Sequence, residues 1–413
     1  RNKLSNNSLA LNSIIVFAGT MVTNVGAYLY HLLMGRMLGP SGYGELSSLL
    51  SIFYIFNVPL LVGQTVLVKF ISGFKAEGKI GQAKSLFLLV TKIFLIIAVL
   101  GLPAAFISDG WVVAFLHLSR PLLFLLIYLL FAFSLLSIVI VSTLQGYQKF
   151  IWMVLVGVGG IGLKLLISIP FVAWGVYGVL WAAVLASIGI YMTSFIPLRF
   201  LFQVVSKPVT LSKKRVFSYF IPTFLTLLGI TSLYSTDIIL VRHFFSGETA
   251  GLYAALGILG KIIFYASSAI GIVLFPVLSE RFAKKNSTNK LIISSLGVVS
   301  FISMGITLVY FLFPDFIVQA LFGKAYTGAG ALLGLFGIFI TLFSIGNILS
   351  LACLAIENTG VWVAPFVCAL LQIVGITLFH ENIRTVILIN IFICSLFVLG
   401  SGGYFLWKER LHA

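Results

Sequence analysis

Apolar runs of about 20 residues recur along this chain, and they constrain its fold more than any other feature. The hydrocarbon core of a bilayer is about 30 Å thick, and an α-helix needs roughly 20 apolar residues to cross it. The runs of this length lie near residues 8–34, 43–70, 83–106, 121–144, 151–174, 176–202, 216–241, 249–278, 290–315, 327–354, 360–379 and 384–407. They predict an all-α membrane protein with twelve transmembrane helices.

The composition agrees with lipid as the main solvent. Hydrophobic residues make up 60% of the chain and charged residues 9%, and the mean hydropathy is +1.16. An average soluble domain is about a quarter charged and under half apolar. A soluble protein of this length could not bury so much apolar surface. The first run is also too long for the core of a signal peptide, so we count it as a spanning helix.

Basic residues orient the expected spans. The chain has 26 Lys and Arg against 10 Asp and Glu, and 18 of the 26 fall on one side of the spans and five on the other. Positively charged loops stay in the cytoplasm, so both termini are expected there, in a multi-pass protein of the cytoplasmic membrane. The basic excess indicates contact with anionic membrane lipids, and no nucleic acid partner is expected.

The most basic loop divides the chain in the middle. It reads QVVSKPVTLSKKR, and it predicts an N-terminal lobe at 1–202, a basic cytoplasmic linker at 203–215 and a C-terminal lobe at 216–413. The stretches MLGPSGYGELSSLL (37–50) and FFSGETAGLYAALG (244–257) echo each other at the start of the second span of each half. Transporters are often built from repeated halves. We therefore expect two pseudo-symmetric six-helix lobes around a central cavity.

Motifs for catalysis or cofactor binding are weak. GVGGIG at 157–162 fits the dinucleotide fingerprint, but that fingerprint needs a preceding strand and an acidic residue about 20 positions further on. Here the glycines lie within an apolar run, where close packing of helices is the better interpretation. The five histidines and three cysteines show no paired or metal-ligand spacing. We predict a transporter and not an enzyme, with no catalytic residues, metal or cofactor.

Three lysines near the centres of expected spans are the main candidates for substrate binding: Lys92, Lys164 and Lys261. A lysine at the bilayer centre costs about 2.5–3.5 kcal/mol, so such residues usually face a cavity or a partner. Snorkelling towards the interface is the alternative, and Lys164 could also serve local packing. Because few acidic residues lie nearby, the three lysines predict an anion-receptive cavity.

A second candidate group lies at the expected outer ends of spans: Arg36, Glu45, Asp237 and Arg242. A lone carboxylate at the end of an apolar run is costly unless it is paired. We expect Asp237 to hold the entrance of the second lobe, by pairing with Arg242 or with Arg36 across the cleft. Binding of a coupling cation by Asp237 is the alternative.

Four segments carry a resemblance over essentially the whole chain: GRMLGPSGYGELSSLLSIFYIFN (35–57), WGVYGVLWAAVLAS (174–187), STDIILVRHFFSGETAGLYAALGILGK (235–261) and IGIVLFPVLSERFAKKN (270–286). They resemble the polysaccharide or O-antigen flippases of the multidrug/oligosaccharidyl-lipid/polysaccharide exporter superfamily. The resemblance implies two six-helix lobes that rock between inward-open and outward-open states around a cationic cavity. It also makes Asp237 the family's characteristic aspartate before the turn into the eighth span. Residues 360–385 depart from the family because they lack its proline- and glycine-bearing loop.

The resemblance implies a substrate as well. In this family a polyprenyl-diphosphate-linked glycan crosses the membrane, so the three lysines would meet the diphosphate. Glycosyltransferases and a polymerase of the same pathway are the implied protein partners. The favoured function is therefore a flippase that translocates a lipid-linked oligosaccharide by alternating access, for cell-surface polysaccharide synthesis.

Two other functions stay open. A cation-coupled multidrug exporter of the same fold is expected to carry acids deep in its cavity, whereas the three mid-depth charges here are basic. A membrane-embedded glycan polymerase or ligase is expected to show a long external loop with catalytic Arg or His, and the polar stretches here are short.

Overall fold

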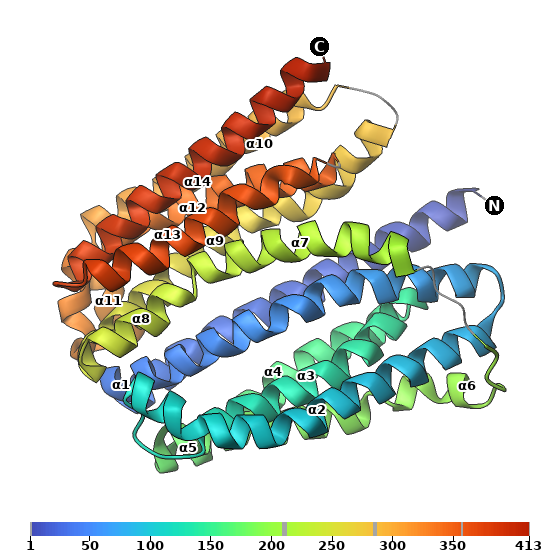
Figure 1. The fold of residues 1–413 in the computed structure, drawn as a ribbon, viewed down its shortest axis with the longest axis horizontal. Coiled ribbons are helices and arrows are strands. Elements are labelled where there is room, and N and C mark those ends of the chain that lie inside the picture. Colours follow the sequence, from blue (N-terminus) through green and yellow to red (C-terminus); the bar gives the residue numbers. More distant parts are fainter. Residues whose placement is uncertain (1, 209–212, 284–286, 357, 413) are drawn as a thin grey trace. The chain divides into compact units, whose positions relative to one another are not determined.

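Helices make up almost all of the described chain (Figure 1). The structure is a computed structural model that describes residues 2–208, 213–283, 287–356 and 358–412, and it contains no strand within these ranges. The α-helices are α1 (Asn2–Ala76), α2 (Ile80–Leu116), α3 (Leu123–Gly146), α4 (Phe150–Phe171), α5 (Gly175–Thr193), α6 (Arg199–Phe202), α7 (Lys213–Leu233), α8 (Thr236–Phe244), α9 (Gly247–Ala283), α10 (Asn289–Leu312), α11 (Pro314–Phe322), α12 (Gly330–Ala355), α13 (Val363–Leu378) and α14 (Ile383–His412). The predicted all-α membrane fold is confirmed.

The number of membrane spans is consistent with twelve. Within the described residues, nine helical stretches are long and apolar enough to cross a membrane, and a tenth is the pair Phe220–Leu233 and Thr236–Phe244, bent by 40°. Two of the nine, Ile15–Ala76 with 62 residues and Phe150–Phe202 with 53, each contain two expected spans. A helix of 62 residues is about 93 Å long, roughly three times the bilayer core.

Glycines interrupt both of these long stretches. Gly39 has φ 69° and ψ 176° inside α1, and Gly175 has φ 68° where α5 begins. Glycine adopts positive φ without the steric cost that a Cβ brings. Each break lies between two expected spans, so the chain turns where the sequence supplies a residue that permits it.

The described chain forms two compact units. Unit 1 consists of Arg1–Leu38 and Phe56–Phe217, and unit 2 consists of Gly39–Ile55 and Ser218–Ala413. The segment 39–55, which the sequence analysis assigned to the N-terminal lobe, packs with the helices of unit 2. Of the predicted linker, residues 203–208 follow α6 without helical structure, and residues 209–212 lie outside the described residues.

Lysines at helix ends stabilise unit 1. The Lys84 Nζ donates to the carbonyl oxygens of Phe202 and Val204 at 3.2 and 2.7 Å, and the Lys149 Nζ donates to that of Pro197 at 2.7 Å. The last carbonyl groups of a helix lack intrahelical partners, so these contacts satisfy acceptors that would otherwise be exposed. These two lysines thus hold the end of this unit together.

Unit 2 is built around α12, which packs against α9, α10 and α14. Small hydroxyl side chains meet between these helices: Ser267 lies 2.9 Å from Ser303, and Thr307 lies 3.0 Å from Thr341. Such residues allow close approach of helices in lipid and supply interhelical hydrogen bonds. The helices that carry the candidate site are therefore held in a well-packed frame.

Candidate functional site

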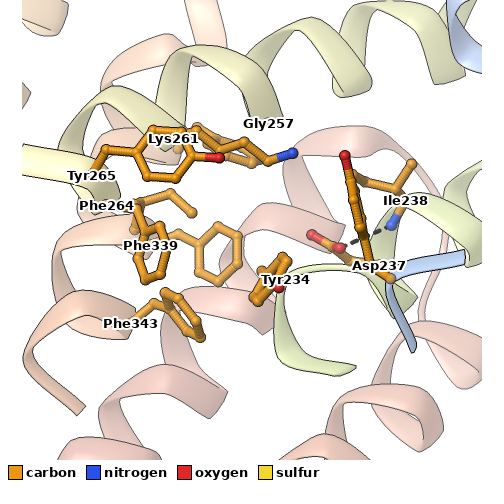
Figure 2. Close-up of a pocket in the computed structure, with 12 residues that line it drawn as sticks. Tyr234, Asp237, Ile238, Gly257, Lys261, Phe264, Tyr265, Phe339 and Phe343 are labelled. Carbon is orange, nitrogen blue, oxygen red and sulfur yellow. Dashed lines mark hydrogen bonds between the residues drawn. The ribbon is translucent and has the colours of Figure 1, made fainter. Parts of the chain in front are cut away.

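A cavity of about 120 Å³ lies within unit 2 (Figure 2). It is lined by Tyr54, Tyr234, Asp237, Ile238, Gly257, Lys261, Phe264, Tyr265, Phe336, Phe339, Ile340 and Phe343. Seven of these twelve side chains are aromatic, and one acid and one base provide the charge. The cavity therefore combines apolar walls with a small number of polar groups, as ligand sites commonly do.

Helical spacing explains how two elements contribute most of the lining. On α9 the lining residues are 257, 261, 264 and 265, and on α12 they are 336, 339, 340 and 343. Residues three or four positions apart lie on one face of a helix. One face of each of these two helices therefore lines the cavity.

Three aromatic rings of the lining contact one another. The ring centroids of Tyr234 and Phe343 are 5.6 Å apart, those of Phe264 and Phe343 are 5.6 Å apart, and those of Tyr234 and Phe264 are 6.2 Å apart. These separations and tilted geometries are favourable for aromatic pairs. Figure 2 shows the rings of Phe264, Phe339 and Phe343 gathered on one side of the cavity and Asp237 on the other.

Asp237 is the centre of a buried hydrogen-bond network. Its side chain is 1% exposed. Its Oδ2 accepts from the Tyr253 hydroxyl at 2.6 Å and from the Asn390 Nδ2 at 3.3 Å, and its Oδ1 accepts from the Ile238 N–H at 2.8 Å. The Asn390 Nδ2 also donates to the Tyr253 hydroxyl at 2.8 Å. A buried carboxylate needs such donors, because an unpaired one loses its hydration without compensation.

Gln372 extends the network to the bend between α7 and α8. Its Nε2 donates to the Asn390 Oδ1 and to the Leu233 carbonyl, both at 2.9 Å. Leu233 is the last residue of α7, where the carbonyl has no intrahelical partner. The network therefore joins α8, α9, α13 and α14 to the bend.

Lys261 shares the cavity with Asp237. The ammonium group lies 5.1 Å from the centroid of the Tyr54 ring, a cation–π distance. Lys261 and Asp237 also interact electrostatically across the cavity. Lys261, which was predicted from the sequence to bind an anion, therefore has the acidic residue Asp237 in the same cavity.

The other two candidate lysines belong to unit 1. Lys92 is exposed on α2, and Lys164 is partly buried on α4 with its ammonium group 3.8 Å from the centroid of the Tyr30 ring. Tyr30 is 1% exposed. Because Lys261 is in unit 2, a cavity shared by the three lysines stays a prediction.

Lys164 differs from Lys261 in its electrostatic surroundings. Unit 1 has two acidic residues, Glu77 and Asp109. Glu77 forms an ion pair with Lys79 at 2.6 Å, and Asp109 accepts from the backbone N–H groups at the start of α3. Both carboxylates of unit 1 therefore have other partners, and the positive charge of Lys164 is not balanced by either.

The structure brings Glu45 and Arg242 together in unit 2. Their side chains are 4% and 6% exposed, and they interact electrostatically. Asp237 accepts hydrogen bonds from Tyr253 and Asn390 in the same unit, and its expected pairing with Arg242 stays a prediction. Arg36 is exposed and belongs to unit 1, so its relation to Asp237 stays a prediction.

Close glycine contacts hold the segment 39–55 in unit 2. A Cβ on Gly44 would come within 2.7 Å of the Gly251 backbone nitrogen, and a Cβ on Gly251 would overlap the Pro40 carbonyl. These glycines belong to the two stretches that echo each other in the sequence. The echo therefore marks two segments that pack against each other.

The network partners Tyr253, Gln372 and Asn390 were not among the residues predicted from the sequence. The two amides carried a usable signal, because they are strongly polar side chains inside apolar spans, and such residues usually hydrogen-bond between helices. The aromatic lining carried none: with 38 Phe and 15 Tyr in the chain, position alone does not separate a lining ring from a packing ring.

The sequence matches a known protein family. The family described as "Polysaccharide biosynthesis protein" matches residues 33–330, which include the three candidate lysines and Asp237. No curated protein sequence matches the chain.

Solved structures share the fold at low identity. The lipid II flippase MurJ in an inward closed conformation has a TM-score of 0.72 at 15% identity, covering 97% of this chain and 87% of its own. A multidrug resistance MATE family transporter of the MOP superfamily in an inward-facing conformation has a TM-score of 0.73 at 14% identity, covering 96% and 97%. A MOP superfamily transporter from Pyrococcus furiosus, described as having a binding pocket of reverse polarity, has a TM-score of 0.65 at 18% identity, covering 97% and 94%.

These neighbours are membrane transporters and flippases, not enzymes, and at such low identity the likeness shows the fold alone. The family match covers well over half of the chain. The chain is a multi-pass membrane protein of the polysaccharide biosynthesis protein family, with the fold of the MOP superfamily transporters.

Proposed function

We propose that this protein is a flippase that translocates a polyprenyl-diphosphate-linked oligosaccharide across the cytoplasmic membrane by alternating access. The lipid tail stays in the bilayer while the head group crosses, and the product supplies cell-surface polysaccharide synthesis. Family membership supports the glycan, and the lipid II flippase among the solved structures supports the class of reaction.

Lys164 is the observation that carries the proposal. A cation that is partly buried in a membrane helix is costly without a partner. The Tyr30 ring contacts Lys164, but neither carboxylate of unit 1 supplies an anion that would balance its charge. A diphosphate supplies that anion, and a cation–phosphate contact is a strong, charge-assisted hydrogen bond. Lys92 and Lys261 are the further candidate contacts for the diphosphate, from the exposed face of α2 and from the cavity of unit 2.

The orientation and partners follow from the same proposal. Both termini lie in the cytoplasm, where the basic loops meet anionic lipid. The substrate is assembled on a polyprenyl carrier before it crosses, so glycosyltransferases act before this protein and a polymerase acts after it. Glu45, Arg242 and Arg36 are the candidate residues of the lobe entrance. Asp237 holds that entrance, with binding of a coupling cation as its alternative role.

A second candidate function is a cation-coupled multidrug exporter. The observation that favours it is Asp237 in an aromatic-lined cavity, because aromatic faces and a carboxylate together suit an organic cation. Lys261 in the same cavity opposes this function, since it would repel a cationic drug.

A binding competition separates the two functions. Purified protein in detergent is titrated with geranylgeranyl diphosphate carrying one glucose residue and, separately, with the lipophilic cation tetraphenylphosphonium. The flippase proposal expects saturable binding of the glycolipid, which the cation does not displace, and weakening of that binding by about tenfold or more in Lys164→Ala. Saturable binding of the cation without binding of the glycolipid would refute the proposal and support the exporter.

A further inference from the structure

The cavity of unit 2 is close to electrically balanced. Its charged lining residues, Lys261 and Asp237, interact with each other, and the remaining lining residues are neutral. An anion in the cavity would meet the Asp237 carboxylate, and a cation would meet the Lys261 ammonium. The electrostatics therefore favour a neutral ligand over a charged one.

The lining nevertheless offers polar groups to such a ligand. Lys261 supplies N–H donors, and Asp237 brings a carboxylate to the lining. The rings of Tyr234, Phe264 and Phe343 line the same cavity. A ligand that fits has hydroxyl groups at its edge and apolar C–H faces.

A pyranose ring has this chemistry. Its hydroxyl groups both donate and accept, and its axial C–H groups form apolar patches that lie against aromatic faces. The size agrees as well: at about 10–15 Å³ for each water-sized occupant, 120 Å³ takes about ten heavy atoms, close to one sugar ring.

The geometry points to a subsite for one neutral sugar ring of the glycan in the cavity of unit 2, which Tyr234, Phe264, Phe343 and the Asp237–Lys261 pair all line. This inference rests on the proposed function for its substrate and changes one assignment in it: Lys261 holds a sugar hydroxyl in place of the diphosphate, which Lys164 of unit 1 holds. The two units then recognise different parts of one substrate, and the aromatic side chains of unit 2 determine which glycan is accepted.

Two lipid probes test whether the sugar and the diphosphate are bound by different residues. Equilibrium binding is measured for geranylgeranyl diphosphate carrying one glucose residue and for bare geranylgeranyl diphosphate, and the ratio of the two affinities is compared between variants. The informative residue is Tyr265, because it lines the cavity and is 37% exposed, so its replacement removes less buried surface than that of a fully buried ring. Tyr265→Leu keeps an apolar side chain and removes the ring, and Tyr265→Phe keeps the ring.

In the wild type the glucosylated lipid should bind more tightly than the bare lipid. Tyr265→Leu should lower the affinity for the glucosylated lipid by about two- to tenfold, the range of a single aromatic contact, and leave the bare lipid unchanged. Tyr265→Phe should keep the wild-type ratio. The control is Lys164→Ala, which should weaken both lipids by the same factor.

A lipid probe with a charged sugar provides the second part of the experiment. Asp237→Asn removes the negative charge and leaves the Lys261 ammonium unopposed, so a probe with glucuronate in place of glucose should gain affinity relative to the glucose probe. Equal weakening of both lipids by Tyr265→Leu, or no gain for the glucuronate probe in Asp237→Asn, would overturn the sugar subsite while leaving the flippase proposal intact. If the wild type binds neither diphosphate lipid, the flippase proposal fails, and the subsite fails with it.

Discussion

Removal of one hydroxyl group tests whether Asp237 is held as a charged carboxylate. In Tyr253→Phe, Asp237 loses its shortest hydrogen bond, the 2.6 Å contact with the tyrosine hydroxyl, and Asn390 loses an acceptor at 2.8 Å. Asn390 retains Asp237 as an acceptor at 3.3 Å, so its loss is partly recovered. Hydrogen bonds to charged groups contribute about 1.5–3 kcal/mol, and a net loss of about 2 kcal/mol in the free energy of unfolding follows.

The matched control is Tyr128→Phe in unit 1. The Tyr128 hydroxyl donates to the carbonyl oxygens of Ile97 at 3.1 Å and Ala98 at 2.9 Å, which are neutral acceptors. A neutral hydrogen bond contributes about 1 kcal/mol, so this variant should lose about half as much stability. Chemical denaturation in detergent, followed by circular dichroism at matched protein concentration, measures both losses.

A double-mutant cycle isolates the interaction of Tyr253 with Asp237. Tyr253→Phe should cost less in the Asp237→Asn background than in the wild type, with a coupling energy of at least about 1 kcal/mol. A cost for Tyr253→Phe no larger than that of Tyr128→Phe, together with a coupling within about 0.3 kcal/mol of zero, would refute a charged Asp237 held by this network.

Two further predictions concern packing and orientation. Gly251→Ala should destabilise the protein by about 1–3 kcal/mol, because its Cβ overlaps the backbone of Pro40, whereas Gly305→Ala, with nothing within 4 Å, should not; denaturation midpoints of the two variants decide. Cysteines at Ser287 and Thr327, both exposed, test the orientation in intact cells. An impermeant thiol reagent should label position 327 and not position 287, and the reverse pattern would contradict cytoplasmic termini.

The sequence predicted the helices of this fold well because one physical rule governs them. A segment that crosses lipid must be long and apolar. The glycines at 39 and 175 even mark where two long stretches divide. The rule says nothing about which helices pack together, so the assignment of residues 39–55 to unit 2 could not be predicted. That assignment depends on backbone contacts between Gly44 and Gly251, about 200 positions apart.

The charged residues of the candidate site could be predicted from the sequence, but the residues that they contact could not. Charged residues are rare in this chain, so Lys261 and Asp237 stand out in the sequence, and the structure places both at one cavity. The partners of Asp237 do not stand out in the same way. Asn390 is 153 positions away in the sequence, and the nearest arginine, Arg242, interacts with Glu45. Only the pairings of Asp237 and of Arg242 in the structure show which charged side chains have a partner within unit 2.

Translocation by the purified protein tests the central claim most directly. Proteoliposomes are loaded with geranylgeranyl diphosphate carrying one glucose residue, and the glucose that reaches the outer leaflet is measured by its oxidation with impermeant periodate. The account predicts rapid oxidation of the glycolipid beyond the fraction exposed in protein-free liposomes, slowing by about tenfold or more in Lys164→Ala. Oxidation limited to the fraction seen in protein-free liposomes would contradict the account.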